Sequence, residues 1–516
     1  MEILAIFVAS SFFLYLVVSL AKFFYKAWWY PLHTQKLMRA QGIRGPPYKF
    51  LQGNTKEVLM MRRESTKTPM GLIHDVLPRV LPHINLWTKL YGRSFLSWHG
   101  CRAELYITEP DLIKEVLNNK NGVYVKGKPE GNLKKLLGDG LVMAEGKKWS
   151  RQRKLANHAF HVENLKNMVP TMISSVEKMI EKWGYHEQKE IEVEEEFRVL
   201  TSDVISKTAF GSNYIDGQKI FAMLRKLTSI IAANALQPKL PVIGKFIRRH
   251  DDIEGEKLEH GIRESFIQII ERRKETIQTD LKGYGSDYLG LLVAGSQEED
   301  ETKRLSIDDM IDECKTFYFA GHETTMNLLT WTIFLLAINT DWQEKARKEV
   351  FDIFGENYPH AKDNGMGKLK TMTMIINETL RLYTPVATIR RTVASQVKLG
   401  EILLPPGIEI VIPPLVSHYD PQIWGDDVHL FTPDRFSEGL TKAAENTNAY
   451  LPFGMGPRIC VGSNFAVIEA KIALSMILQR YTFTLSPSYV HSPILQLLIR
   501  PQHGVQIMFH GLQGFA

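Results

Sequence analysis

Residues 3–21, close to the start of the chain, form an uninterrupted run without a charged side chain. That length is about what an α-helix needs to cross the hydrocarbon core of a bilayer. Two lysines and three aromatic residues follow the run, namely Lys22, Lys26, Trp28, Trp29 and Tyr30. Positive charge and aromatic residues at this end predict a single-pass anchor with the rest of the chain in the cytoplasm. A cleaved secretory signal is the alternative, and the absence of a small-residue cleavage site before the lysines disfavours it.

The remaining composition is that of a globular protein, with 44% hydrophobic and 23% charged residues among 516. The 63 basic residues nearly balance the 57 acidic ones, and no basic cluster marks a nucleic-acid surface. Three cysteines, Cys101, Cys314 and Cys460, cannot build a disulfide framework, which fits a reducing compartment.

The chain divides into an anchor at 1–26, a linker with a proline-rich hinge at 27–47, and one large domain at 48–516. Helical periodicity predicts helices over 168–183, 253–274, 306–338, 342–354, 369–382 and 464–479. Short β-branched runs at 103–110 and 407–414 predict strands. Residues 278–304 are charged and contain glycine, so we expect an exposed connector there. The predicted fold class is mostly α with small β-sheets.

Cys460 lies in "FGMGPRICVG", residues 453–462, a loop whose glycines allow tight turns and close backbone approach. A helical pattern begins just after the loop, so the free N–H groups of its first turn would stabilise a thiolate. Such a thiolate could be a nucleophile, a metal ligand or the axial ligand of a haem iron. A nucleophile needs a histidine base that sequence cannot place, and zinc or iron–sulfur sites need several cysteines. A haem thiolate therefore fits best.

The same loop resembles the F-x-x-G-x-R-x-C-x-G pattern of cytochromes P450. The matching residues are Phe453, Gly454, Gly456, Arg458, Cys460 and Gly462. The resemblance implies a P450-type fold that binds haem b, with Cys460 as the proximal iron ligand and Arg458 holding a haem propionate.

The predicted helix at 306–338 begins with a capping-box-like pair, Ser306 and Asp309, and carries "AGHETT" (320–325) at its middle. Glycine and threonine hydroxyls weaken a helix there, which indicates a local opening that serves chemistry. A satisfied polar cluster between packed helices is the alternative reading.

This segment is similar to the oxygen-binding motif of the P450 family. On that resemblance Ala320 and Gly321 leave room over the iron, Thr324 hydrogen-bonds bound dioxygen, and Glu323 supports proton delivery from solvent. His322 occupies the variable position of the motif, and we assign it no role.

"NETLRLYTP" contains Glu378 and Arg381 at a spacing that allows an ion pair on one helix face. It resembles the E-x-x-R of the family, which implies a buried network completed by Arg435. Thr384 departs from the family pattern, in which many members have a second proline, and this puts the shape of the turn at 386–389 in question.

"WSRQR" places Trp149 and Arg153 four residues apart and resembles the W-x-x-x-R helix whose two residues bind a haem propionate. Arg391 falls where relatives supply another propionate arginine. A solvated basic helix face is the alternative reading for this segment. We expect its lysines and arginine to attract an acidic electron donor, and they are Lys147, Lys148, Arg151 and Lys154.

Together these motifs imply a P450 monooxygenase of the endoplasmic-reticulum membrane, similar to the plant clan that includes brassinosteroid- and gibberellin-modifying hydroxylases and secologanin synthase. Electrons would come from NADPH through a cytochrome P450 reductase, with cytochrome b5 as a further candidate donor. A lipophilic small molecule would bind among 122–137, 228–240, Phe317, Ala320, 386–389 and 494–497. Two alternatives stay open, a haem-thiolate lyase or isomerase acting on hydroperoxides without dioxygen or reductase, and a haem-binding membrane sensor without turnover.

Overall fold

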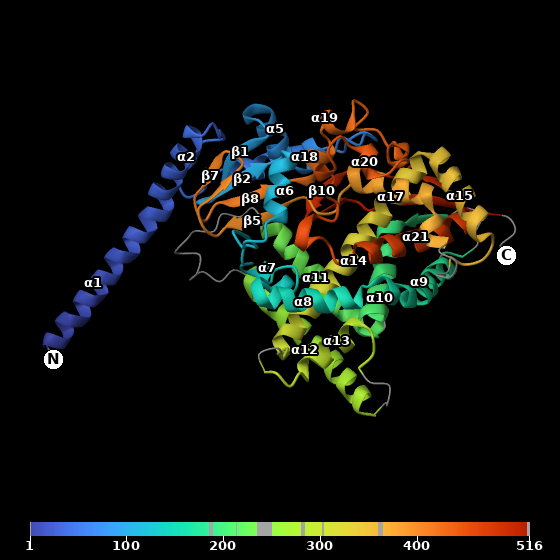
Figure 1. The fold of residues 1–516 in the computed structure, drawn as a ribbon, viewed down its shortest axis with the longest axis horizontal. Coiled ribbons are helices and arrows are strands. Elements are labelled where there is room, and N and C mark those ends of the chain that lie inside the picture. The colour runs from blue at the N-terminus through green and yellow to red at the C-terminus, as the bar shows by residue number, and fades with distance from the viewer. Residues whose placement is uncertain are drawn as a thin grey trace.

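The computed structural model describes residues 2–184, 189–212, 214–234, 250–279, 284–301, 304–359 and 365–512. Figure 1 shows a mostly helical body from which one helix projects at the amino-terminal end. The described residues form four small sheets, the largest of which lies beside the base of the projecting helix. The mostly α class with small sheets is confirmed.

The longer helices before the middle of the chain are α1 (Glu2–Phe24), α2 (Tyr30–Ala40), α3 (Thr55–Ser65), α5 (Pro82–Tyr91), α6 (Pro110–Asn118), α7 (Asn132–Leu137), α8 (Gly146–Ala159), α9 (Val162–Trp183), α10 (Val193–Phe210) and α11 (Tyr214–Asn234). Later ones are α12 (His250–Thr279), α13 (Tyr288–Ser296), α14 (Ile307–Ile338), α15 (Thr340–Phe354), α17 (Lys370–Leu382) and α21 (Ser463–Arg480). Short turns of helix are α4 (Leu77–Val80), α16 (Gly365–Lys368), α18 (Pro414–His418), α19 (Pro421–Trp424) and α20 (Leu440–Ala443).

Helix α14 runs through the middle of the body and packs on α10, α17 and α21. Its 32 residues correspond to about 48 Å at 1.5 Å per residue. The expected capping box is present, because the Ser306 hydroxyl accepts the Asp309 N–H while the Asp309 carboxylate accepts the Ser306 N–H. The buried side chains that surround this helix form the main hydrophobic core.

The largest sheet has the order β1-β2-β8-β5-β3, and its strands are β1 (Ser94–His99), β2 (Arg102–Ile107), β8 (Glu409–Ile412), β5 (Ile389–Val393) and β3 (Tyr124–Val125). Only the β2–β8 pair is parallel, with Leu105 opposite Ile410. A second sheet, β4-β12-β9, joins β4 (Lys189–Glu192), β12 (Gln506–Gly511) and β9 (Tyr481–Leu485). Two hairpins complete the set, β6 (Val397–Leu399) with β7 (Ile402–Leu404) and β10 (Pro493–Gln496) with β11 (Leu498–Pro501).

The six predicted helices and two predicted strands are all confirmed, and their ends differ from the prediction by at most six residues. The expected connector at 278–304 is wrong in its middle, where α13 forms. Asp287 caps this helix by accepting the N–H of Gly290, and Tyr288, Leu289 and Leu292 are buried. The segment is apolar on every side, so it carries no helical periodicity for sequence reasoning to detect. Residues 280–283 and 302–303 of that stretch lie outside the described residues.

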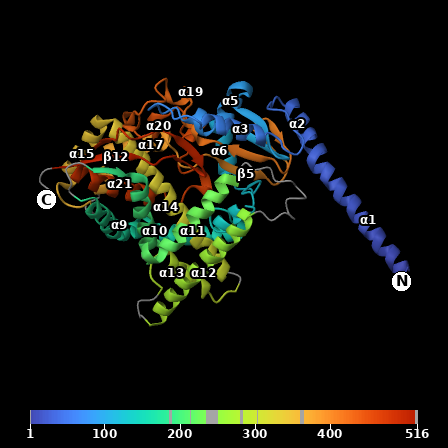
Figure 2. The ribbon, with the colours of Figure 1, turned by 180° about the vertical axis from the view of Figure 1, so that it is seen from behind.

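One helix among the described residues, spanning Ile3–Ala40, is long and apolar enough to cross a membrane, and its most apolar window is 0% buried. Figure 1 shows α2 beside the sheet that contains β1, β2 and β8, and Figure 1 and Figure 2 both show α1 extending clear of the body. Helical geometry continues through Tyr25–Trp29 into α2, and the chain becomes extended only after Gly42.

Candidate active site

The Cys460 loop folds back on itself just before α21. The Cys460 N–H donates to the carbonyl of Phe453 at 2.9 Å, and the Ile459 N–H donates to that of Gly456 at 3.0 Å. Gly456 has φ +71°, and a Cβ there would lie 2.4 Å from the carbonyl oxygen of Leu117. Glycine is therefore required at this position. A Cβ at Gly462 would meet nothing within 4 Å, so that glycine leaves open space beside the thiol.

The thiol of Cys460 is accessible, yet protein atoms packed around the loop limit its hydration. Burial raises the pKa of Cys460, and the N–H of Gly462 and the charge of Arg153 offset this only in part. The sequence predicted that the N–H groups at the helix start would stabilise a thiolate. They do lower the pKa, but burial of the thiol outweighs them. A cation bound to the sulfur would supply the missing stabilisation.

Helix α8 brings two of the predicted residues against this loop. The guanidinium of Arg458 lies over the ring of Trp149, with 4.3 Å between the guanidinium carbon and the ring centroid. Arg153 donates from Nη1 to the carbonyl of Ile459 at 2.5 Å. The predicted residues Trp149, Arg153, Arg458 and Cys460 thus meet in one place.

Arg391, on β5, adds a further positive charge. It is buried, and its guanidinium donates to the carbonyl of Arg390 at 2.8 Å. Burial, followed by repulsion from Arg458, lowers the pKa of Arg391 to about 10. Burial together with Arg391 and Arg458 lowers the pKa of Lys126 to about 7. Within the described ranges, the one ion pair made by these cations and Arg153 is between Arg458 and Glu145, at 2.7 Å.

The donor set suits haem. One accessible thiol could hold the iron, and the surplus cations Lys126, Arg153, Arg391 and Arg458 could hold two propionates. No cluster of three or more His, Cys, Asp or Glu side chains in the described part of the chain could hold a metal ion. A multi-ligand metal centre therefore finds no support there.

The middle of α14 is half-buried within an otherwise buried stretch. Ala320, Gly321 and Thr324 are accessible, whereas His322, Glu323 and Thr325 are buried. The Thr324 hydroxyl donates to the carbonyl of Ala320 at 2.7 Å. A Cβ on Gly321 would lie 2.8 Å from the side chain of Ile205 on α10, so glycine lets these two helices approach closely.

Phe160, at the end of α8, connects α14 to the helix that follows the thiol loop. Its ring stacks on Phe317 of α14 with centroids 5.4 Å apart and meets Phe465 of α21 edge-on at 5.6 Å. Phe317 is 6% exposed, because this stack covers its ring.

Glu323, next to Thr324 in the chain, is buried in an ion-pair network. Arg198 on α10 donates to Glu323 and to Glu194, each at 3.0 Å, and Arg500 on β11 pairs with Glu194 at 2.8 Å. Burial alone would raise the pKa of Glu323, but hydrogen bonding and charge from His322 and the charges of Arg198 and Arg500 hold it at about 2. His322 lies 3.3 Å from the Glu323 carboxylate and so belongs to this network.

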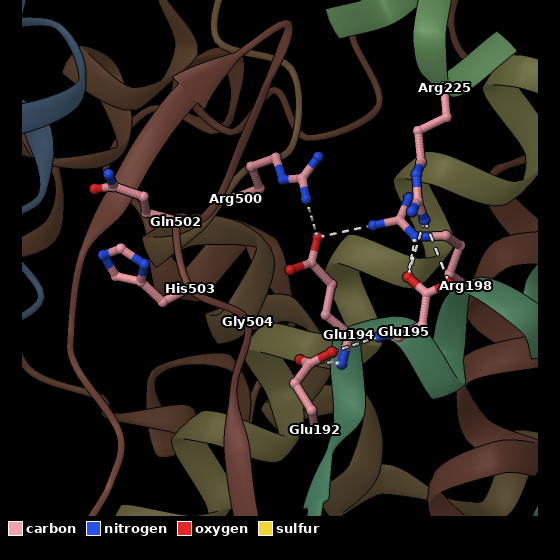
Figure 3. Close-up of a pocket in the computed structure, with 9 residues that line it drawn as sticks. All are labelled: Glu192, Glu194, Glu195, Arg198, Arg225, Arg500, Gln502, His503 and Gly504. Carbon is pink, nitrogen blue, oxygen red and sulfur yellow. Dashed lines mark hydrogen bonds and ion pairs between the residues drawn. The ribbon is translucent and has the colours of Figure 1, made fainter. Parts of the chain in front are cut away.

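A cavity of about 290 Å³ opens on the other side of the same arginines. Figure 3 shows Arg198 and Arg500 both reaching Glu194, and Arg225 reaching Glu195. Burial raises the pKa of Glu194, and its arginine partners offset this only in part. Polar groups thus run from this cavity through Arg198 to Glu323.

Glu378 and Arg381 form a bidentate pair with two contacts of 2.7 Å, and both side chains are 0% exposed. Arg381 also donates to the carbonyls of His418 and Val428. Arg435 lies 3.7 Å from the Glu378 carboxylate and pairs more closely with Asp427, at 2.9 Å.

Thr384 is fully buried, and its hydroxyl has no hydrogen-bond partner in the described structure. The following turn is held by backbone instead, since Pro385 accepts the N–H of Ile499 and Val386 bridges to Leu498. Val386 is 39% exposed. Residues 235–240 of the expected pocket lie outside the described residues.

Sequence reasoning missed Lys126, Glu194, Arg198 and Arg500. Arg198 is 125 residues from Glu323 along the chain, so no local spacing could pair them. Lys126 lies within the 122–137 segment expected to line the pocket, but nothing in that sequence marks this lysine as a partner of Arg391 and Arg458.

A family model described as Cytochrome P450 matches residues 79–509. The chain is 51% identical to Cytochrome P450 CYP749A22 of Panax ginseng, over 98% of this chain and 97% of that protein. It is 42% identical to Cytochrome P450 734A1 of Arabidopsis thaliana, over 94% and 93%, and 39% identical to Cytochrome P450 CYP72A219 of Panax ginseng, over 98% of each. With this coverage, and with an accessible thiol beside Arg153 and Arg458, the chain belongs to the cytochrome P450 family of haem-dependent monooxygenases.

Proposed function

We propose that this protein is a membrane-anchored haem-thiolate monooxygenase that inserts one oxygen atom of O2 into a lipophilic small molecule. Its electrons come from NADPH through a flavoprotein reductase, with cytochrome b5 as a further candidate donor. The observation that carries the proposal is the meeting of Cys460, Trp149, Arg153, Arg391 and Arg458 beside open space at Gly462.

When bound, the haem supplies dioxygen activation at an iron whose thiolate ligand favours O–O cleavage. Cys460 would ligate the iron, and the sulfur would lose its proton because the metal charge outweighs the burial that now raises its pKa. Arg153, Arg391 and Arg458, joined by Lys126, would bind the propionates through charge-assisted hydrogen bonds. Phe453 and Gly462 would border the group.

Thr324 would hold a proton at Oγ1 for the reacting oxygen. Its hydroxyl now donates to Ala320, so it would have to rotate, giving up a bond worth about 0.5–1.5 kcal/mol. Glu323 is ionised over the physiological range because its pKa is about 2. With its pKa this low, it would take up a proton only after its contact with Arg198 is broken, and in the ion-paired state it would serve as a fixed negative charge beside Thr324.

The substrate class is supported by the apolar, accessible residues near the expected pocket. Val386 is 39% exposed, and Leu495 and Leu497 are half-buried. A terpenoid, steroid or fatty acid would bury its surface against such side chains.

The reductase would dock on the exposed face of α8. Lys148 and Arg151 both contact Asp309, so part of the predicted basic face is neutralised. Lys147 and Lys154 are exposed and form no ion pair among the described residues. These two lysines are therefore the stronger candidates for contact with an acidic partner.

We place the protein in the endoplasmic-reticulum membrane as a single-pass protein, with the catalytic body in the cytoplasm. Support comes from the apolar helix α1 and from the lysines and aromatic residues that follow it.

A carbon monoxide difference spectrum of the reduced, haem-loaded protein tests the central assignment. We expect the red-shifted band of a thiolate-ligated haem and its loss in Cys460→Ala. Turnover that requires NADPH and reductase would exclude a hydroperoxide lyase or isomerase and a sensor without turnover. A protein without the red-shifted band, or a Cys460→Ala variant that keeps it, would disprove the proposal.

A further inference from the structure

The apolar helix α1 does not end where the expected linker begins. Its helical path continues through a π-helical turn, Tyr25–Trp29, into α2, and the residue at the junction, Tyr30, has helical φ and ψ of −57° and −49°. The whole stretch Ile3–Ala40 forms one helix of 38 residues. A flexible connection between α1 and the body would require a break that this stretch does not contain.

The π-helical turn is explained by Pro31 and by a hydroxyl from the body. Proline has no N–H, so the carbonyl four residues earlier, that of Ala27, loses its helical donor, and the proline ring widens the turn. The hydroxyl of Tyr48 replaces the missing donor at 2.6 Å. The Tyr48 N–H in turn donates to the Gln35 side chain at 2.9 Å. The body therefore contacts the helix at the π-helical turn, where Tyr48 supplies the hydrogen bond that Pro31 cannot donate to Ala27.

The face of this helix that meets the body follows a helical stripe. Ala27, Pro31, Thr34 and Met38 are buried, at spacings of four, three and four residues. Met38 belongs to the core cluster that includes Leu96 and Trp98 of the large sheet. The side-chain amide of Gln41, at the end of α2, makes two hydrogen bonds to the backbone of Leu403, at 3.1 and 2.6 Å.

The same turn carries the aromatic residues expected at a membrane interface. Tyr25, Trp29 and His33 stack along one side of the helix, with centroid distances of 5.2 and 4.6 Å. On the body side, Trp28 meets Phe50 edge-on at 6.2 Å. Aromatic residues of this kind lie at the headgroup level, so the bilayer surface and the contact at Ala27 lie at the same height along the helix.

We infer that α1 and the catalytic body form one rigid unit, which holds the body directly on the phospholipid surface in a single orientation. The surface that meets the headgroups comprises Trp28, Trp29, Leu32 and Phe50, each between 45% and 55% exposed, and we call it the joint surface. This inference rests on the membrane anchoring proposed above, whereas the rigid joint itself rests on the contacts of Tyr48, Gln41 and Met38.

The test uses the full chain, loaded with haem, in nanodiscs of phosphatidylcholine and phosphatidylserine. Spin labels attached through non-natural ketone residues at Ser11 on α1 and Lys114 on α6 report the distance between anchor and body. We expect a narrow distance distribution in the parent protein and a broader one in the double variant Tyr48→Phe/Gln41→Ala. A Gly-Ser-Gly insertion between Phe24 and Tyr25 gives the fully uncoupled reference. Tyr91→Phe, which removes a hydroxyl away from the joint, should leave the distribution narrow.

A second measurement tests the contact with lipid. A benzoylphenylalanine photocrosslinker should form lipid adducts at Phe50 but not at Leu430, which is 61% exposed away from the joint. A parent distribution as broad as that of the insertion, or no lipid adduct at Phe50, would overturn the inference. Failure to enter nanodiscs without detergent would instead count against the membrane anchor, and the spin-label distances in micelles would then test the joint alone.

Discussion

The Glu378–Arg381 network and the Cys460 loop both gather arginines around buried backbone, but they balance charge in opposite ways. Arg381 is matched by both oxygens of Glu378 and by carbonyls, and nothing in the pair is exposed. Around Cys460, the cations Lys126, Arg153 and Arg391 have no carboxylate partner among the described residues, and Arg458 has one. We call the first network closed, because its charges are matched within the protein, and it stabilises the fold. We call the second open, because its excess positive charge can be neutralised by an anionic ligand. Substitutions at the two places should therefore act on different properties.

The largest effect is expected where the network is closed. Glu378→Leu or Arg381→Leu leaves an unpaired buried charge, and we expect a loss of about 3–5 kcal/mol of the free energy of unfolding. That is a large part of a typical total, so folded protein should be scarce. Urea unfolding of the haem-free chain measures the loss.

The double variant Glu378→Leu/Arg381→Leu sharpens this prediction, because removing both charges should cost less than the two single losses added together. Lys398→Ala, which breaks an exposed pair with Glu401, is the matched control and should change stability by under ~0.5 kcal/mol. If either single variant were as stable as the parent protein, the claim that each charge of this buried pair depends on the other would be wrong.

At the open site, Cys460→Ser should abolish turnover without unfolding the chain. The side chain is accessible and serine differs from it by a single atom, so we expect the free energy of unfolding of the haem-free protein to change by under ~0.5 kcal/mol. Reductase-coupled turnover and urea unfolding, measured on one preparation, separate the two properties. A variant that retains turnover, or that fails to fold, would contradict the distinction between the two regions.

Two neighbouring arginines on β5 provide a finer contrast. Arg391 is buried without a carboxylate, whereas Arg390 pairs with Glu104 at 2.7 Å and with Glu409 at 3.2 Å. Arg391→Met should weaken haem binding on the order of 10- to 100-fold, the equivalent of about 1.5–3 kcal/mol for a charge-assisted bond. It should leave the haem-free fold no less stable, because repulsion from Arg458 is removed.

Arg390→Met should do the reverse, since it opens a closed pair and touches no surplus charge. Haem titration and urea unfolding of both variants give the four values needed. If the two substitutions had the same effects, the assignment of Arg391 to the open site would be wrong.

The pH dependence of stability should distinguish Lys126 from an ordinary surface lysine. Its folded pKa is about 7, well below the usual value, so between pH 7 and about 10 the unfolded chain binds more protons at this residue than the folded chain. Stability of the haem-free protein should therefore rise with pH across that window. Lys126→Met should make the rise smaller, and bound haem should do the same because its propionates would raise the pKa. Identical pH profiles for the parent and Lys126→Met would contradict this.

Sequence reasoning identified the residues of both regions where motifs were contiguous. Cys460, Arg458 and the Glu378–Arg381 pair each lie within a few residues of a recognisable neighbour. It could not supply partners that the fold brings from far away, such as Arg198 and Arg500 for the Glu323 network. It also could not tell an open site from a closed one, because that depends on which carboxylates surround each cation in space.

Two smaller differences have the same physical origin. The thiol pKa is raised and not lowered, because burial of the Cys460 loop outweighs its helix start. Helix α13 was missed because a helix that is apolar on all sides lacks the polar face that periodicity requires.

The smallest effect on activity is expected from helix α8, where lysines without an ion-pair partner among the described residues lie beside basic residues that pair with Asp309. Lys148 and Arg151 are tied to Asp309, whereas Lys147 and Lys154 are exposed. Lys147→Glu/Lys154→Glu should slow reduction by the reductase a few-fold at low salt, and the difference should fade as screening shortens the range of the charges. Stopped-flow reduction across an ionic-strength series measures this. Lys89→Glu/Lys114→Glu, the same charge change on α5 and α6, is the control and should leave the rate unchanged. An equal slowing in both double variants would assign the effect to net charge and remove α8 as the docking surface.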